Sequence, residues 1–201
     1  MNRPQLKHPP VGRPKDQARA CYPDPSPSEE RLPPGPTTSE CPGCRLVLPQ
    51  HDGPRHPYIG ASAACWALYG HLLARAYSDP EIIPILQLIV DTYAVQHPGT
   101  PERRAAQSVG IHLMTLCMVL EQGADPRDGP QLHKRMVTRP AFSWLDPPPN
   151  RGSVTVGELV AVTDAGELDR RVWDWGREVW DAWALHHPTV RGWLRTSVGS
   201  G

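Results

Sequence analysis

Apolar side chains recur at helical spacing through much of residues 62–187, and this periodicity constrains the fold more than any other feature of the sequence. The clearest case is a tryptophan-rich stripe with about 100° between successive residues, formed by Leu168, Val172, Trp175, Val179 and Trp183. Alternation of apolar and polar residues, which a half-buried strand would show, is confined to the short run 153–156. The sequence therefore predicts an all-α domain with an orthogonal or bundle-like arrangement of helices.

Start and stop signals place the ends of these helices. Ser62 precedes the first apolar stripe as an N-cap, and Pro80 falls inside the first turn of the next helix. Thr155 and Glu158 have the spacing of a capping box, and Pro188 should stop the tryptophan-rich helix. The predicted helices span residues 62–77, 78–97 and 100–120, a weaker segment at 132–137, a short helix from 155, and 167–187.

Proline divides the chain into a tail and a domain. Residues 1–40 hold 10 of the 25 prolines and few large apolar side chains, so they cannot bury enough surface to offset the entropy of ordering. We expect residues 1–40 to form a disordered proline-rich tail. Residues 41–198 are expected to form a single all-α metal-binding domain that begins with a cysteine-containing loop.

Charge and hydropathy exclude several classes of partner. Lys and Arg number 21 and Asp and Glu number 21, which leaves no positive excess to bind nucleic acid or an anionic membrane surface. No apolar run reaches the roughly 18 residues of a membrane helix, and no secretory signal is present. We therefore expect a cytoplasmic protein whose five cysteines are reduced.

Cys41-Pro42-Gly43-Cys44 is the strongest chemical motif. In a C-x2-C knuckle, proline and glycine turn the chain so that both sulfurs can bind one tetrahedral ion, and zinc is the metal expected. No second C-x2-C or H-x3-5-H lies nearby, so the remaining ligands must come from distant segments. A redox pair and two incidental loop thiols are the alternatives, and we rank both below a metal site.

Histidines at two predicted helix ends are the candidate partners of the knuckle. His97 lies on the apolar side of its helix, and at least one of His186 and His187 should face the interior. The predicted metal ligands are thus Cys41, Cys44, His97 and His187, with His186 as a substitute for His187. The alternative is that these are buried core histidines. Seven further residues are not predicted as ligands, because they have no partner signal, lie in the tail or lie on apolar stripes: His8, His51, His71, His133, Cys21, Cys65 and Cys117.

A second set of polar residues is a candidate for catalysis. Asp91 and His112 fall at matching levels if their helices form an antiparallel hairpin, so they could pair as an acid–base element. His56 and Tyr58 lie in the loop just after the knuckle, where they could contact a substrate. From the helix pattern alone, a solvated helix face is the favoured interpretation of Asp91, and an exposed loop position is the alternative for His56.

Several motifs also resemble one protein family. They are the knuckle, Gly53 to Tyr58, Cys65-Trp66, Val90 to Gly99, Ser108 to Leu113, and Trp180 to Trp193. Over about residues 40–195 the chain resembles the bacterial DUF5946 proteins. This resemblance implies a shared architecture and shared polar positions at Asp91, Gln96, His97, His112 and His187, but it supplies no reaction.

Two hypotheses for function follow. In the first, the protein is an enzyme, most simply a metal-assisted hydrolase or transferase acting on a small molecule in an aromatic-lined cavity. In the second, a closed Cys2His2 zinc site is structural and the protein is an interaction or ligand-binding module. An open coordination position would support the first hypothesis, and a fully coordinated ion the second. We favour an enzyme whose zinc ion is structural.

Overall fold

The computed structural model describes residues 37–137 and 141–198, which lie in one compact unit spanning residues 35–201. The all-α prediction is confirmed, because helices make up most of this unit. The α-helices are α1 (Ala63–Ser78), α2 (Leu86–Gln96), α3 (Arg103–Leu120), α4 (Gly129–Val137), α5 (Val156–Ala161), α6 (Ala165–Ala182) and α7 (His187–Val198). Short 3-10 turns occur at η1 (Ile83–Ile85), η2 (Pro126–Asp128) and η3 (Ala184–His186).

Two predicted helix starts are confirmed in atomic detail. The Ser62 side chain accepts a hydrogen bond from the Cys65 backbone N–H at 3.2 Å, which caps α1. Thr155 and Glu158 form the expected capping box at the start of α5. Helix α2 begins later than predicted, because Pro84 lies in the 3-10 turn η1 that precedes it.

The prediction of one helix over 167–187 is wrong at its end. Helix α6 stops at Ala182, the turn η3 follows, and α7 begins at His187. Pro188 does not end a helix, because it lies in the first turn of α7, where its missing N–H has no intrahelical partner to lose. This break changes the direction in which His186 and His187 point.

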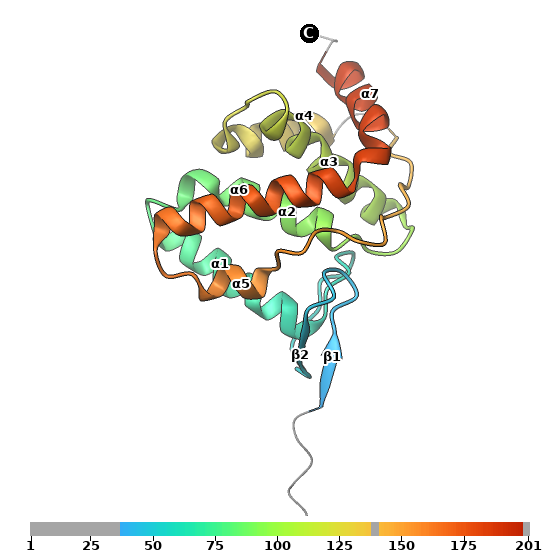
Figure 1. Ribbon diagram of the computed structural model, residues 1–201. Coiled ribbons are helices and arrows are strands. Elements are labelled where there is room, and N and C mark those ends of the chain that lie inside the picture. The colour runs from blue at the N-terminus through green and yellow to red at the C-terminus, as the bar shows by residue number, and fades with distance from the viewer. Residues whose placement is uncertain (1–36, 138–140, 199–201) are drawn as a thin grey trace, which may run out of the picture. The chain divides into compact units, whose positions relative to one another are not determined.

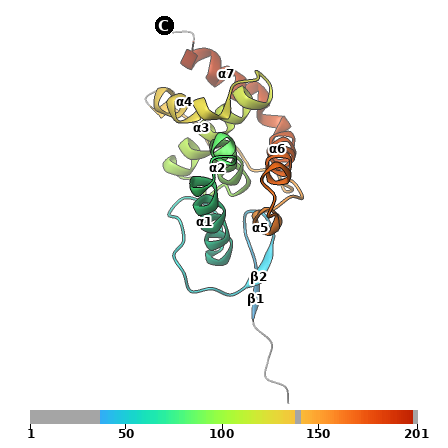
Figure 2. The ribbon, with the colours of Figure 1, turned by 90° about the vertical axis from the view of Figure 1, so that its left-hand side faces the viewer.

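Helix α2 is the centre of the packing and contacts both α3 and α6. Figure 1 shows α6 crossing in front of α2, and Figure 2 shows α1 and α5 lying side by side below them. A Cβ at Gly176 of α6 would lie only 3.2 Å from Leu88 Cδ1 and 3.4 Å from Thr92 Oγ1 of α2, so glycine allows this close approach. The Trp175 indole N–H donates to the Gln96 side chain at 3.1 Å and ties the two helices together.

A small antiparallel hairpin precedes α1, with β1 (Thr38–Glu40) paired to β2 (Val47–Pro49). It was not predicted, and β1 lies within the span expected to be a tail. Most of that predicted tail, residues 1–36, lies outside the described residues. In the described part of the chain, no helix is both long enough and apolar enough to cross a membrane.

Candidate metal centre and pocket

The cysteine knuckle forms the tip of the β1–β2 hairpin. The Cys41 backbone N–H donates to the Leu46 carbonyl at 2.9 Å, and the Arg45 N–H donates to the Cys41 carbonyl at 2.9 Å. Arg45 has φ of 64°, a left-handed conformation that closes this tight turn. The turn directs Cys41 and Cys44 into the protein, where Cys41 is fully buried and Cys44 nearly so.

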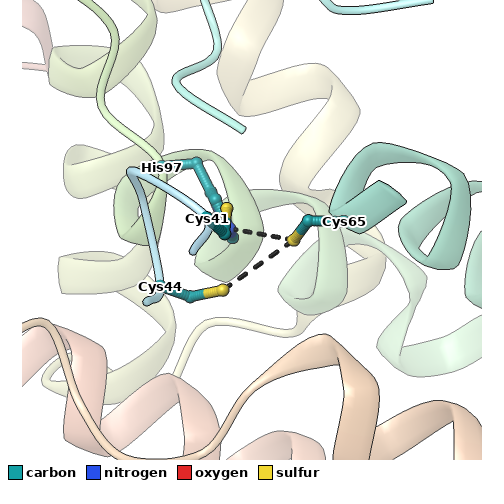
Figure 3. A group of neighbouring side chains, drawn as sticks. All are labelled: Cys41, Cys44, Cys65 and His97. Atoms are coloured by element: carbon teal, nitrogen blue, oxygen red, sulfur yellow. Dashed lines mark hydrogen bonds between the residues drawn. The ribbon is translucent and has the colours of Figure 1, made fainter. Parts of the chain in front are cut away.

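Two helices bring the other members of the cluster. Cys65 lies in the first turn of α1, just after its Ser62 cap, and His97 is the C-cap residue of α2. Both side chains are fully buried. Cys41, Cys44, Cys65 and His97 each offer one ligand atom, and these atoms all lie within 4.8 Å of one another. Figure 3 shows the four side chains converging from the hairpin, α1 and the end of α2.

The spacing of these atoms fits a tetrahedral ion. Two sulfurs bound to one metal at about 2.3 Å would lie about 3.8 Å apart, and a sulfur and an imidazole nitrogen about 3.6 Å apart. The Cys44 and Cys65 sulfurs are 3.8 Å apart. The Cys65 sulfur lies 3.4 Å from His97 Nε2. This cluster can therefore hold a metal ion with three sulfur ligands and one nitrogen ligand.

Hydrogen bonds around the cluster orient its ligand atoms. His97 Nδ1 is 2.8 Å from the Tyr93 carbonyl, so Nδ1 donates its proton there and Nε2 keeps a free lone pair facing the sulfurs. The Ser62 backbone N–H donates to the Cys41 sulfur at 3.4 Å. The Tyr93 hydroxyl donates to the Cys65 sulfur at 3.5 Å. Such contacts are typical of the groups that surround metal ligands.

Each of the three thiols shifts the pKa of its neighbours. Hydrogen bonds from Cys44 and Cys65 lower the pKa of Cys41 far below that of a free thiol. The hydrogen bond to Cys41 raises the pKa of Cys44 to about 11, and contact with both neighbours raises the pKa of Cys65. Without a cation, one thiolate thus suppresses the other two. A divalent ion removes this conflict because it stabilises all three thiolates together.

Arg151 fixes the knuckle against the end of α2. Its Nε atom donates to the Gly43 and Gln96 carbonyls, each at 3.0 Å, and an NH2 group donates to the Pro42 carbonyl at 2.8 Å. Gly43 itself packs against His97, and a Cβ at this position would lie 2.1 Å from His97 Cδ2. Sequence reasoning missed Arg151, because it lies 108 residues from Gly43 and carries no motif.

The predicted fourth ligand does not reach this cluster. His187 stacks on Trp180, with ring centroids 3.8 Å apart, and its Nε2 lies 3.0 Å from the Trp180 carbonyl. His186 Nε2 lies 2.8 Å from the Asp146 carbonyl. Because the chain turns between α6 and α7, neither imidazole lies in the cluster. The fourth position belongs to Cys65, which the sequence pattern indicated as a core residue. The cluster is therefore Cys3His in place of the predicted Cys2His2.

A second polar cluster connects three helices. His112 Nδ1 on α3 lies 2.6 Å from Asp91 Oδ1 on α2, so the predicted pair is present in the structure. His133 Nε2 on α4 lies 2.9 Å from the same oxygen. His133 was discounted from the sequence, because it is 42 residues from Asp91 on a weakly predicted helix. The ligand atoms of these three residues also lie within 4.8 Å of one another.

The Asp91 carboxyl is almost wholly buried, with 1% of its side chain exposed. Burial alone would raise its pKa, but hydrogen bonds to His112 and His133 outweigh that effect and lower the pKa. Asp91 is therefore an ionised group deep in the helical core. The interpretation of a solvated helix face is wrong for this residue.

The two histidines open onto a pocket of about 400 Å³. Its other lining residues are Tyr58, Arg104, Gln107, Ser108 and Ile111. The backbone bridge between Ile59 and Pro98 holds the Tyr58 loop beside the end of α2. His56 does not line this pocket; it packs edge-on against Tyr58 with ring centroids 4.3 Å apart. Tyr58 and His112 thus share the pocket, Asp91 lies behind it, and His56 supports the Tyr58 ring.

Comparison with known families agrees with the resemblance in the sequence. The family described as "Family of unknown function (DUF5946)" matches residues 39–184, which include both polar clusters. No curated protein and no solved structure matches the chain.

Proposed function

We propose that this chain, which belongs to the DUF5946 family because that family matches most of its length, is a zinc-stabilised enzyme acting on a small molecule. The zinc ion is held by Cys41, Cys44, Cys65 and His97. The reaction takes place in the pocket lined by His112 and His133. The observation that carries the proposal is the buried Asp91 carboxylate, which holds both imidazoles at the wall of that pocket.

Zinc is assigned a structural role because its four ligands complete a tetrahedron. Three thiolates and one imidazole are a common closed set, whereas catalytic zinc usually keeps a position for water or substrate. All four side chains are buried, so solvent and substrate have no path to the ion. Its chemical contribution is to fix the loop of residues 41–60 against α1 and α2, which places Tyr58 at the pocket.

The pocket has the composition of a reaction site. Imidazoles accept and donate protons near neutral pH and bind metals, and a buried carboxylate orients them. Arg104 lines the same pocket and is exposed, so a substrate with a carboxylate or phosphate group is favoured. We therefore propose a hydrolytic or transfer reaction on a small anionic molecule in the cytoplasm.

Replacement of Cys65 tests the zinc assignment. Elemental analysis of the untagged wild-type protein should find one tightly held zinc ion after dialysis, and Cys65→Ser should lose it. Cys117→Ser is the matched control, because Cys117 is also a buried helical cysteine but donates to Glu121 outside the cluster. If Cys65→Ser keeps as much zinc as the Cys117→Ser control and the wild-type protein, Cys65 is excluded as a ligand.

Asp91→Asn tests the pocket. We expect this variant to keep its zinc and its helical content but to lose its response to ligand, since the amide cannot hold both imidazoles as the carboxylate does. The measurement is thermal stabilisation by a library of small carboxylates and phosphates. Arg104→Gln should weaken the same responses about tenfold or more, the loss expected for one charged contact.

A protein-interaction module is the competing function, because a closed zinc site also suits a binding scaffold. The library measurement separates the two. If no compound stabilises the wild-type protein in a way that depends on Asp91 and Arg104, the enzyme proposal fails and the interaction module is the better account.

A further inference from the structure

We propose that Asp91, His112 and His133 hold a second divalent transition-metal ion, separate from the zinc site and open to the pocket. The inference rests on the proposed function in one respect, which is that the same pocket receives the substrate. It goes further by identifying the group that would act on the substrate as a metal ion. The chemical class of the site is two imidazoles and one carboxylate with free coordination positions.

The geometry points to one shared centre. Both His112 Nδ1 and His133 Nε2 approach the same carboxylate oxygen, at 2.6 Å and 2.9 Å. Ligand atoms about 2.0–2.2 Å from one ion lie roughly 3 Å apart when they occupy neighbouring positions. The two rings meet at 71° with centroids 4.9 Å apart, so they converge edge to face without stacking. Three atoms from three helices thus gather about a single point.

The charge of the cluster favours a cation. Asp91 is ionised and nearly fully buried, and its hydrogen-bond partners are Gln87, His112 and His133. None of these three partners carries a fixed positive charge. A buried carboxylate is costly unless it is paired with a cation or bound to a metal, and a divalent ion meets that need. Imidazole ligands favour zinc, iron, nickel or copper over magnesium and calcium.

Gln87 positions the carboxylate. Its Nε2 group donates to Asp91 Oδ1 at 3.0 Å from one turn earlier on α2. Gly129, at the start of α4, makes room for this side chain, because a Cβ there would lie 2.1 Å from Gln87 Cγ. The approach of α4 that Gly129 permits also brings His133 to the cluster. Outer contacts of this kind orient the ligands of metal sites.

The side facing the pocket distinguishes this site from the zinc cluster. Side-chain exposures of 15% for His112 and 22% for His133 place both ligands at the pocket wall. A three-residue set leaves coordination positions free for water and for a substrate oxygen. An ion there would act as a Lewis acid on an anionic substrate held by Arg104, which suits hydrolysis.

Cobalt substitution of the full-length protein tests this inference. Metal-free protein is loaded with Co(II), and bound cobalt and absorption are recorded. We expect two equivalents per chain. The first should show intense thiolate-to-cobalt charge-transfer bands from the Cys3His cluster, and the second only weak bands of nitrogen and oxygen ligation. His133→Ala and Asp91→Asn should each bind one equivalent and keep the thiolate bands, while His71→Ala, at an exposed position on α1, should bind two.

Each result decides between the two sites. A single equivalent in the wild-type protein, with thiolate bands, would overturn the second site and leave the zinc proposal intact. Two equivalents that persist in both variants would also overturn it. Absence of thiolate bands would instead contradict the zinc site, whatever the second equivalent does. If the variants fail to fold, the stoichiometry and bands of the wild-type protein still decide.

Discussion

At the scale of single residues, the Cys3His cluster depends on Gly43, where the absence of a side chain leaves room for His97. Gly43 lies between the two knuckle cysteines, and His97 packs directly over it. His97 in turn must present Nε2 to the sulfurs while Nδ1 donates to the Tyr93 carbonyl. A side chain at residue 43 would therefore disturb a ligand without replacing one.

Gly43→Ala should weaken metal binding although every ligand is kept. The new methyl group would lie 2.1 Å from His97 Cδ2 and 2.9 Å from the Gly60 carbonyl, so the knuckle or the imidazole must move. We expect a loss of about 1–3 kcal/mol in the free energy of unfolding, as for overpacked cores. Zinc should also transfer faster to a chelator, which a colorimetric zinc indicator measures.

Gly70→Ala is the matched control for that substitution. Gly70 lies on the exposed face of α1, and a Cβ there meets nothing within 4 Å. Because alanine favours helices over glycine, this variant should gain up to about 1 kcal/mol and release zinc at the wild-type rate. Similar behaviour of the two variants would show that packing over His97 is not what Gly43 provides.

At the scale of elements, α6 holds the segment that leads into α5. The Glu178 carboxylate accepts hydrogen bonds from the Ser153 N–H at 2.7 Å, the Ser153 hydroxyl at 2.9 Å and the Val154 N–H at 3.2 Å. Gly152, with φ of 93°, makes the turn that presents these donors. The same segment carries Arg151, which binds the Gly43 and Pro42 carbonyls, so α6 acts indirectly on the cysteine knuckle.

Glu178→Gln should be destabilising in a pH-dependent way. Burial would raise the pKa of Glu178, but these hydrogen bonds lower it below its ordinary value of 4.5. The carboxylate therefore adds stability above about pH 4.5, and this stability is lost as the pH falls through the lowered pKa. We expect a loss of about 1 kcal/mol at pH 7, reduced by solvent screening, from denaturant unfolding. A difference that does not shrink on acidification would contradict this role.

At the scale of the whole unit, both proposed sites include a residue of α2, with His97 at its C-cap and Asp91 in its middle. The Cys3His cluster joins the hairpin, α1 and the C-terminal end of α2, while the Asp91 cluster joins α2, α3 and α4. The apolar core between α2, α3 and α6 extends well beyond the Cys3His cluster, although the three cysteines pack at its edge. Loss of zinc should thus affect one region of the unit far more than the rest.

Removal of zinc by a strong chelator tests this division. We expect most of the helical signal in circular dichroism to remain, while the melting temperature falls by on the order of 10 °C, the effect of several kcal/mol in a unit of this size. Hydrogen exchange should accelerate in residues 41–60 and at the start of α1. It should stay slow in α3. Uniform acceleration across all helices would show that zinc supports the whole core.

The sequence alone was enough for the helices whose signals are local. Ser62 caps α1, and Thr155 with Glu158 caps α5, because each contact joins residues three apart. The knuckle, His97 and the pairing of Asp91 with His112 also followed from short spacings and helix levels. The break after Ala182 was missed because a proline such as Pro188 can either end a helix or occupy the first turn of the next one. The sequence around it does not distinguish these two positions.

Tertiary structure alone decided which distant residues complete each cluster. In the sequence, Cys65 lies on an apolar stripe like any core residue, and His133 has no partner nearby. They join their clusters only because α1 packs beside the knuckle and α4 packs against α2 and α3. Arg151 reaches the knuckle across 108 residues for the same reason. The sequence determines which residue types are available as ligands. A metal centre also requires that the ligand atoms lie within a few ångströms of one another, and the packing of the helices sets these distances.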